Sequence, residues 1–161
     1  MKRTDHKSHC PINFSLEVVG DPWTLLVVRD IVFYGKHTFS EFMASAERIT
    51  TSVLADRLAL LVEKGILHKS PSTEDKRREV YVLTAKGLAL IPVLVELANW
   101  GVAYDPDVVP NETWLAQSQA DKAQLCAMIH DTVVAGGSVF SGDNSVIAQL
   151  RRNGDPGTGT E

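Results

Sequence analysis

The hydrophobic period of the chain changes at Gly65, and this change constrains the fold more than any other feature of the sequence. Within residues 51–64, leucines recur at spacings of four and three residues, which is typical of one face of an α-helix. After Gly65, residues 66–70 and 79–83 read as two short strands separated by a polar loop. The sequence therefore predicts a helix followed directly by a β-hairpin.

A shorter helix is predicted just before that helix, across a tight turn. Thr38 and Glu41 have the spacing of a capping box, which opens a helix over residues 39–46. Thr50 then caps the helix of residues 51–64. Two helices joined by a tight turn, the second polar on its outward side, form a helix-turn-helix, and a hairpin behind it with cations at its tip forms a wing.

Two further helices are predicted upstream. The first covers residues 11–19, with Pro11 at its first position and Gly20 at its end. Asp21 caps the second, residues 23–34, which is apolar on nearly all sides. A helix of that kind belongs in a hydrophobic core.

The remaining third of the chain gives weaker signals. Thr84 caps a fifth helix that Pro92 should kink and Gly101 should end. Residues 105–110 read as a linker, and residues 112–134 as one helix.

An ordered set of motifs over about residues 10–101 resembles the HxlR family of bacterial regulators. The family's wing carries a Pro-rich stretch followed by Arg and Glu-Tyr, whereas the wing here is similar to that of the MarR family. The motifs are Cys10-Pro11, Gly20-Asp21-Pro22-Trp23-Thr24-Leu25-Leu26, Arg29-Asp30, Phe39-Ser40-Glu41-Phe42, Leu54-Ala55-Asp56-Arg57-Leu58, Leu61-Val62-Glu63-Lys64-Gly65-Ile66-Leu67 and Leu83-Thr84-Ala85-Lys86-Gly87, with the wing at Asp75-Lys76-Arg77-Arg78.

The resemblance implies a homodimer that binds a near-palindromic double-stranded operator, with the helices beginning at Pro11 and Ala85 forming the dimer interface. The residues themselves agree with a dimer, because the helix after Thr84 carries more apolar surface than the core of one small subunit needs. This surface comes from Leu88, Ile91, Val95 and Leu97. The expected fold is mainly α with a small β-hairpin: a winged helix-turn-helix DNA-binding domain that dimerises through its N- and C-terminal helices. The expected divisions are a basic arm at 1–9, an HxlR-type winged helix-turn-helix domain at 10–104, a helical extension at 105–152 and a disordered tail at 153–161.

The helix of residues 51–64 is the predicted reader of a major groove about 12 Å wide. The hairpin tip is expected to contact the sugar-phosphate backbone or a minor groove, and Asp75 is expected to hold Arg77. Asp56 either accepts from a cytosine or orients Arg57. The alternatives are that Thr50 and Thr51 only cap the helix and that the tip is a solvated turn. The candidate DNA-binding residues are Thr50, Thr51, Ser52, Asp56, Arg57, Lys69, Lys76, Arg77 and Arg78.

The net charge of −4 is concentrated at one end. Residues 1–104 hold 13 basic and 12 acidic side chains, whereas residues 105–161 hold 3 and 8. A near-neutral body can still bind nucleic acid if its cations converge on one face.

Cys10 at the first helix start is a candidate redox sensor, because a helix N-terminus stabilises a thiolate and matching cysteines of the resembled family sense oxidants. The other reading is an inert thiol near the dimer interface. His6 and His9 beside it resemble half of a metal site with no second half, so no metal is expected. A small effector is a second possibility, in an aromatic pocket formed by Trp23, Phe33, Tyr34 and Trp100.

The function expected from these features is sequence-specific transcription regulation, with repression as the output. The alternative is a winged-helix module for protein–protein contact without specific DNA binding. We expect no enzyme and no cofactor, because no phosphate-binding loop, nucleophile elbow or metal motif is found. We also expect no membrane span and a cytoplasmic protein, in which Cys10 and Cys126 are thiols.

Overall fold

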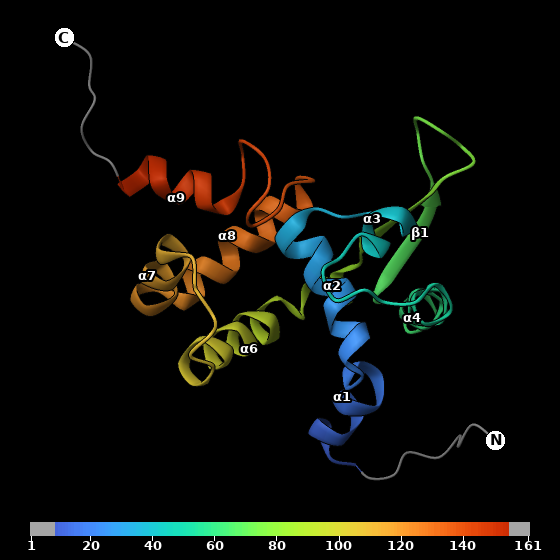
Figure 1. The fold of residues 1–161 in the computed structure, drawn as a ribbon, viewed down its shortest axis with the longest axis horizontal. Coiled ribbons are helices and arrows are strands. Elements are labelled where there is room, and N and C mark those ends of the chain that lie inside the picture. The colour runs from blue at the N-terminus through green and yellow to red at the C-terminus, as the bar shows by residue number, and fades with distance from the viewer. Residues whose placement is uncertain (1–8, 155–161) are drawn as a thin grey trace.

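The computed structural model describes residues 9–154 of the chain. Helix α2 lies at the centre, with the helix-turn-helix and hairpin on one side and the C-terminal helices on the other (Figure 1). The elements in chain order are α1 (Pro11–Val19), α2 (Pro22–Tyr34), α3 (Phe39–Met43), α4 (Thr51–Glu63), β1 (Leu67–Pro71), β2 (Glu79–Leu83), α5 (Ala85–Leu88), α6 (Ile91–Tyr104), α7 (Glu112–Ala120), α8 (Lys122–Val134) and α9 (Val146–Gly154).

The first two helices begin and end where the sequence predicts. Pro11 opens α1, and the Asp21 side chain caps α2 by accepting a hydrogen bond from the Trp23 N–H at 3.0 Å. Gly35 ends α2 with φ +66, a left-handed conformation that favours glycine. Helix α2 contributes much of the core, as its apolar composition predicted.

The helix-turn-helix is confirmed in the capping box of α3 and in its core. The Thr38 hydroxyl accepts from the Glu41 N–H, and the Glu41 carboxylate accepts from the Thr38 N–H at 2.8 Å, which completes the capping box. On α4, the three leucines Leu54, Leu58 and Leu61 are at most 2% exposed.

The predicted hairpin is present, although its first strand begins at Leu67 and not at residue 66. It is antiparallel, and its register pairs Leu67 with Leu83 and Pro71 with Glu79. An isolated bridge joins Thr38 to Val80, and the Tyr81 N–H donates to the carbonyl of His37 at 2.8 Å. The half of β2 next to the tip loop is therefore joined to the segment that opens α3.

The predicted kinked helix after Thr84 is two helices, α5 and α6. Pro92 lies in the first turn of α6, where its missing N–H leaves no internal hydrogen bond unmade, so a new helix begins instead of a bend. Gly101 does not end α6, which continues to Tyr104.

The single helix predicted over residues 112–134 is also two helices. Asp121 caps α8 by accepting from the Gln124 N–H at 2.9 Å, and this cap separates α8 from α7. Helix α9 extends through Gly154, so residues 153 and 154 of the expected tail are helical, and the rest of that tail lies outside the described residues.

We call residues 105–154, with α7, α8 and α9, the C-terminal extension. It packs on α2, where the Phe33 ring makes edge contacts with Trp114 at 5.4 Å and with Phe140 at 5.7 Å between centroids. The Phe140 N–H also donates to the carbonyl of Phe33 at 2.9 Å. The extension therefore shares the hydrophobic core of the preceding helices.

The stretch Ala85–Tyr104 is long and apolar enough to cross a membrane by length and composition, which the sequence analysis did not anticipate. The core helix of a soluble protein can meet the same test, and 22% of this stretch is buried. Ile91 and Val95, which were expected to supply surplus apolar surface, are at most 2% exposed and belong to the core. Leu97 and Trp100 are 49% and 65% exposed, so the outer face of α6 is open.

Candidate nucleic-acid interface

The N-terminal turn of α4 presents short polar side chains to solvent. Thr50, Thr51 and Ser52 are all exposed. Thr50 occupies the cap position, but its side chain makes no capping hydrogen bond, and its hydroxyl lies 3.5 Å from that of Ser52. The reading in which Thr50 caps the helix through its hydroxyl is therefore wrong, and these hydroxyls face outward at the end of the helix that would enter a groove.

Arg57 and Asp56, one turn further along α4, have different surroundings. The Nε of Arg57 lies 3.2 Å from Oδ1 of Asp21, the residue that caps α2. Asp56 is exposed. Arg57 thus pairs with Asp21 and not with Asp56, so the ion pair ties α4 to the start of α2.

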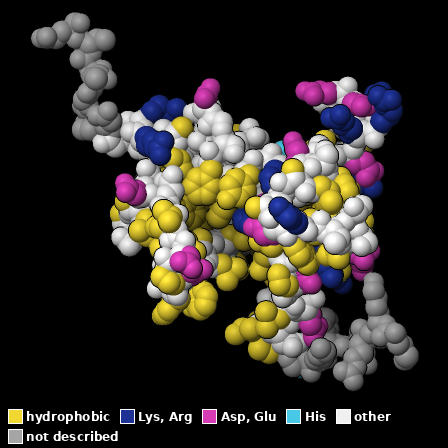
Figure 2. Space-filling view, in the orientation of Figure 1, with side chains coloured by type: hydrophobic (Ala, Val, Ile, Leu, Met, Phe, Trp, Pro, Cys, Tyr) yellow, Lys and Arg dark blue, Asp and Glu magenta, His cyan; other side chains and the backbone are white. Residues whose placement is uncertain are grey.

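The tip of the hairpin, residues 72–78, carries the most exposed cations of the predicted interface. The side chains of Arg77 and Arg78 are 90% and 73% exposed, and Lys76 is exposed beside them (Figure 2). Asp75 accepts from the backbone N–H of Arg77 at 3.0 Å and from its Nε at 3.1 Å, which confirms the predicted pair. The hydrogen bond from the Arg77 side chain lowers the pKa of Asp75, so the carboxylate stays ionised at neutral pH.

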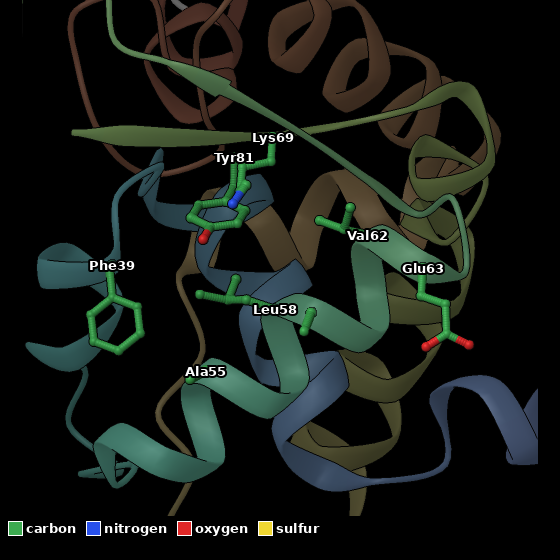
Figure 3. A pocket seen from close by; sticks show the side chains of 8 residues that line it. Phe39, Ala55, Leu58, Val62, Glu63, Lys69 and Tyr81 are labelled. Carbon is green, nitrogen blue, oxygen red and sulfur yellow. The ribbon is translucent and has the colours of Figure 1, made fainter. Parts of the chain in front are cut away.

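Lys69 lies at a groove between the hairpin and α4. The groove encloses about 470 Å³, and Leu58 and Val62 on α4 face Lys69 and Tyr81 on the hairpin (Figure 3). Lys69 donates to Glu79 across the two strands at 2.8 Å, and this hydrogen bond raises the pKa of the lysine. The lysine therefore remains charged at the mouth of the groove between α4 and the hairpin.

Arg48, in the turn between α3 and α4, was missed by the sequence analysis. It is exposed and has φ +55, a left-handed conformation that is uncommon for residues other than glycine. The residue precedes Thr50 by two positions, so its charge lies beside the N-terminal turn of α4. A cation in the turn of a predicted helix-turn-helix is the signal that could have found it.

A buried ion network lies beneath this turn. Asp30 is 2% exposed and accepts from Arg29 Nε at 3.0 Å and from Lys36 Nζ at 3.1 Å, and the Ser45 hydroxyl also donates to it. The guanidinium of Arg29 also donates hydrogen bonds to the carboxylate of Glu47, which extends the network to the surface. Burial by itself lowers the pKa of Arg29, but the hydrogen bonds and charges of Glu47 and Asp30 outweigh it and raise that pKa. The network fixes residues 45–47 against α2.

The outer member of this network gives a pH-dependent prediction. The hydrogen bond from Arg29 lowers the pKa of Glu47 from 4.5 to about 2. Because the folded-state value is the lower one, the pair stabilises the fold above pH 4.5 and loses its effect as the pH falls toward 2. Glu47→Gln should lower the free energy of unfolding by less than about 1 kcal/mol at neutral pH, since Glu47 is partly exposed. Urea denaturation over a pH series should show this difference closing on acidification, whereas a constant difference would contradict the pairing.

The remaining candidate residues are dispersed. Cys10 is exposed at the cap of α1 and forms no disulfide within the described chain. His6 lies outside residues 9–154, and no cluster of three or more metal-binding side chains occurs inside that range. The expected aromatic pocket is not assembled: Phe33 packs on Trp114, whereas Trp100 stacks on Tyr104 at the exposed end of α6.

An α3–turn–α4 unit followed by a cation-tipped hairpin defines a winged helix-turn-helix protein. Residues 18–108 match the model of the HxlR-like helix-turn-helix family, and the chain belongs to that family. The match ends before α7, so most of the C-terminal extension lies outside it.

The relatives and solved structures agree with this assignment. The uncharacterized HTH-type transcriptional regulator Rv3095 of Mycobacterium tuberculosis is 38% identical over 92 residues, which are 57% of each chain. YybR of Bacillus subtilis, described in the same words, is 32% identical over 60% of this chain and 76% of its own. The match thus spans little more than half the length of the mycobacterial relatives.

Two solved structures are similar to this chain over about two thirds of its length. PA1607, a candidate transcription factor, has a TM-score of 0.59 at 38% identity and covers 65% of this chain and 73% of its own. The redox regulator HypR in its oxidized form has a TM-score of 0.54 at 30% identity and covers 62% of this chain and all of its own.

Proposed function

We propose that this chain is a sequence-specific DNA-binding transcription regulator that acts as a homodimer on an operator, with repression as its output. The observation that carries the proposal is the joint exposure of two features on adjacent elements, the N-terminal turn of α4 and the cations of the hairpin tip. Within the described residues, no segment covers either of them. The family assignment and the HTH-type regulators among its relatives support the proposal.

In this proposal α4 enters the major groove with its first turn toward the base edges. Thr51 and Ser52 supply hydroxyl donors and acceptors, and Asp56 can accept from a cytosine amine. Arg57 contacts a phosphate or a guanine only by sharing or leaving its ion pair with Asp21. Lys69, Lys76, Arg77 and Arg78 contact sugar-phosphate or an adjacent minor groove.

Two exposed apolar faces support the dimer. On α1, Ile12 and Leu16 are 69% and 63% exposed, and on α6, Leu97 and Trp100 are similarly open. Both helices extend to the same side of the molecule, and Figure 2 shows hydrophobic side chains gathered there. Exposed apolar surface of this extent is typical of a protein–protein interface. A second copy on this face would place two α4 helices on successive major grooves, about one helical turn apart.

Selection of bound sequences from random double-stranded DNA tests the function. The expected result is a near-palindromic motif whose half-sites lie about 10 base pairs apart. Retention of DNA at low salt only, with no enriched motif, would instead favour the alternative, a winged-helix module for protein–protein contact. The regulator is expected to work in the cytoplasm and to have no enzymatic activity, in keeping with its family.

Arg77→Ala should weaken binding to operator and unrelated DNA alike. Loss of one phosphate contact should lower the slope of log affinity against log salt by about 1. Arg151→Ala, which removes an exposed cation on α9 far from the hairpin, is the matched control and should leave the slope unchanged. Fluorescence anisotropy over a salt series measures both variants, and an unaltered slope for Arg77→Ala would remove this residue from the phosphate contacts.

Oxidation of Cys10 is the switch we propose for this regulator. Its thiol is exposed at the N-terminus of α1, where an oxidant can reach it. Cys126 is partly buried, and burial raises the pKa of its thiol, which reduces the reactivity of Cys126. The likeness to the redox regulator HypR supports the assignment.

Diamide or peroxide should therefore change operator affinity by about tenfold or more, the scale of typical coupling between two sites. Cys10→Ser should abolish the response, whereas Cys126→Ser should retain it. Equal responses of the wild type and Cys10→Ser would reject this switch without affecting the DNA-binding proposal. A small-molecule effector is the other regulatory input we consider.

A further inference from the structure

A second cavity lies on the opposite face of the hairpin from the α4 groove. Side chains alternate along β2, so Tyr81 faces α4 whereas Val80 and Val82 line this second cavity. Its other wall is the end of α8, with Val133 and Val134. We call it the wing–extension cavity; it encloses about 680 Å³, within the range of small-molecule sites.

The walls of this cavity leave apolar surface open to water. Val82 is 39% exposed and Val134 is 63% exposed. One belongs to the hairpin and the other to the C-terminal extension, so an apolar occupant would contact both at once. Removing that surface from water favours binding of an apolar molecule.

Two carboxylates line the cavity, those of Glu41 and Glu74, and no Lys or Arg is among its described lining residues. His37 is the other titratable side chain of the lining, and its Nδ1 lies 3.1 Å from the carbonyl oxygen of Tyr81. Burial alone would raise the pKa of Glu41, but hydrogen bonds from the backbone N–H groups of His37 and Thr38 lower it, so the carboxylate stays ionised.

Three nearby cations of the hairpin are directed to other carboxylates, and a fourth, the exposed Lys76, is not part of the cavity lining. Arg77 and Arg78 pair with Asp75, and Lys69 pairs with Glu79 on the face toward α4. An occupant of the wing–extension cavity therefore meets aliphatic side chains, hydroxyl groups, the imidazole of His37 and two carboxylates. That combination selects a molecule that is both apolar and positively charged.

We propose that the wing–extension cavity binds a lipophilic cation, an apolar small molecule with one positive charge. The occupant contacts β2, the hairpin tip at Glu74 and the end of α8, and so restrains the hairpin relative to the extension. The binding itself does not depend on the proposed function. The regulatory consequence of binding does rest on the proposed function. A ligand that restrains the hairpin should change the affinity for DNA, and DNA should change the affinity for the ligand by the same factor.

Two ions of the same shape and opposite charge test the proposal. The full-length chain, without DNA, is titrated calorimetrically with tetraphenylphosphonium and with tetraphenylborate. The cation should bind once per chain and about tenfold more tightly than the anion. Methyl resonances of Val80, Val82, Val133 and Val134 should shift with the same saturation curve.

Two variants locate the site. Val134→Lys places a cation at an exposed position of the cavity wall and should weaken the phosphonium by about tenfold, and Glu74→Gln should weaken it by about threefold. Glu112→Gln, which neutralises an exposed carboxylate at the start of α7, is the control and should bind as the wild type does. Equal affinity for the two ions, or indifference to both Val134→Lys and Glu74→Gln, would overturn the proposal. Because no DNA is present, that failure would leave the DNA-binding proposal standing.

Discussion

Asp30→Ala is expected to lower the free energy of unfolding by about 3 kcal/mol. The carboxylate is buried and accepts hydrogen bonds from Arg29, Lys36 and Ser45. Without it, two partly buried cations lose their innermost partner, and an uncompensated buried charge is more harmful than the loss of one favourable contact. Urea denaturation at neutral pH, followed by far-UV circular dichroism, measures the change.

The matched control removes the carboxylate at the exposed end of the same network. Glu47→Ala should lower the free energy of unfolding by less than about 1 kcal/mol, because its side chain is partly solvated. Asp30→Asn keeps the shape of the side chain and should fall between the two. If Asp30→Ala proved no more destabilising than Glu47→Ala, the network would not be what fixes the turn before α4.

Trp114→Ala is expected to destabilise the chain by about 4 kcal/mol. Its ring is 4% exposed and packs between Phe33 of α2 and Phe140 of the extension. Truncation removes both ring contacts and leaves a cavity at the contact between α2 and the extension. Denaturation monitored by circular dichroism suits this variant, because its fluorescence is altered by the substitution itself.

Gln119→Ala on the same helix is the control, since that side chain is exposed and should change stability by less than about 0.5 kcal/mol. A separate early transition for Trp114→Ala would show that the extension unfolds on its own. A loss below about 1 kcal/mol would show that the extension contributes little to the core.

The helix-turn-helix and hairpin could be predicted because their signals are local. Thr38 and Glu41 lie three residues apart, and the change of period after Gly65 occurs within a few residues. Each of these signals acts through hydrogen bonds or side-chain spacing along one element, which a sequence displays directly. The exposure of the site residues on α4 and at the hairpin tip could be predicted in the same way, because side-chain spacing along each element shows which residues face outward.

The breaks inside the long helices were visible in the sequence but misread. Pro92 was expected to bend a helix, although the same residue is favoured at the first turn of a new one. Asp121 and Gln124 have the spacing of a capping pattern, yet the apolar residues on either side suggested a continuous helix. In both cases a local signal for the start of a new helix outweighed the apolar periodicity.

The buried network and the packing of the extension could not be predicted. Asp30 meets Ser45 only because the chain returns after α3, and nothing near either residue indicates that contact. Phe140 lies in a Gly- and Ser-rich segment that reads as a loop, but its ring packs on α2. The Arg57–Asp21 ion pair is of the same kind, since it depends on how α4 crosses the start of α2.

The attachment of β2 to the segment before α3 bears on how new binding specificities could arise in this protein. Because Thr38 and His37 hold β2 at Val80 and Tyr81, close to where the tip loop ends, residues 72–78 form an outer loop whose length and composition can vary without shifting α4. Loops exchanged from related regulators at this point should alter the preference for flanking DNA alone. In the proposed binding mode, the reading of each half-site would then evolve separately, through the first turn of α4.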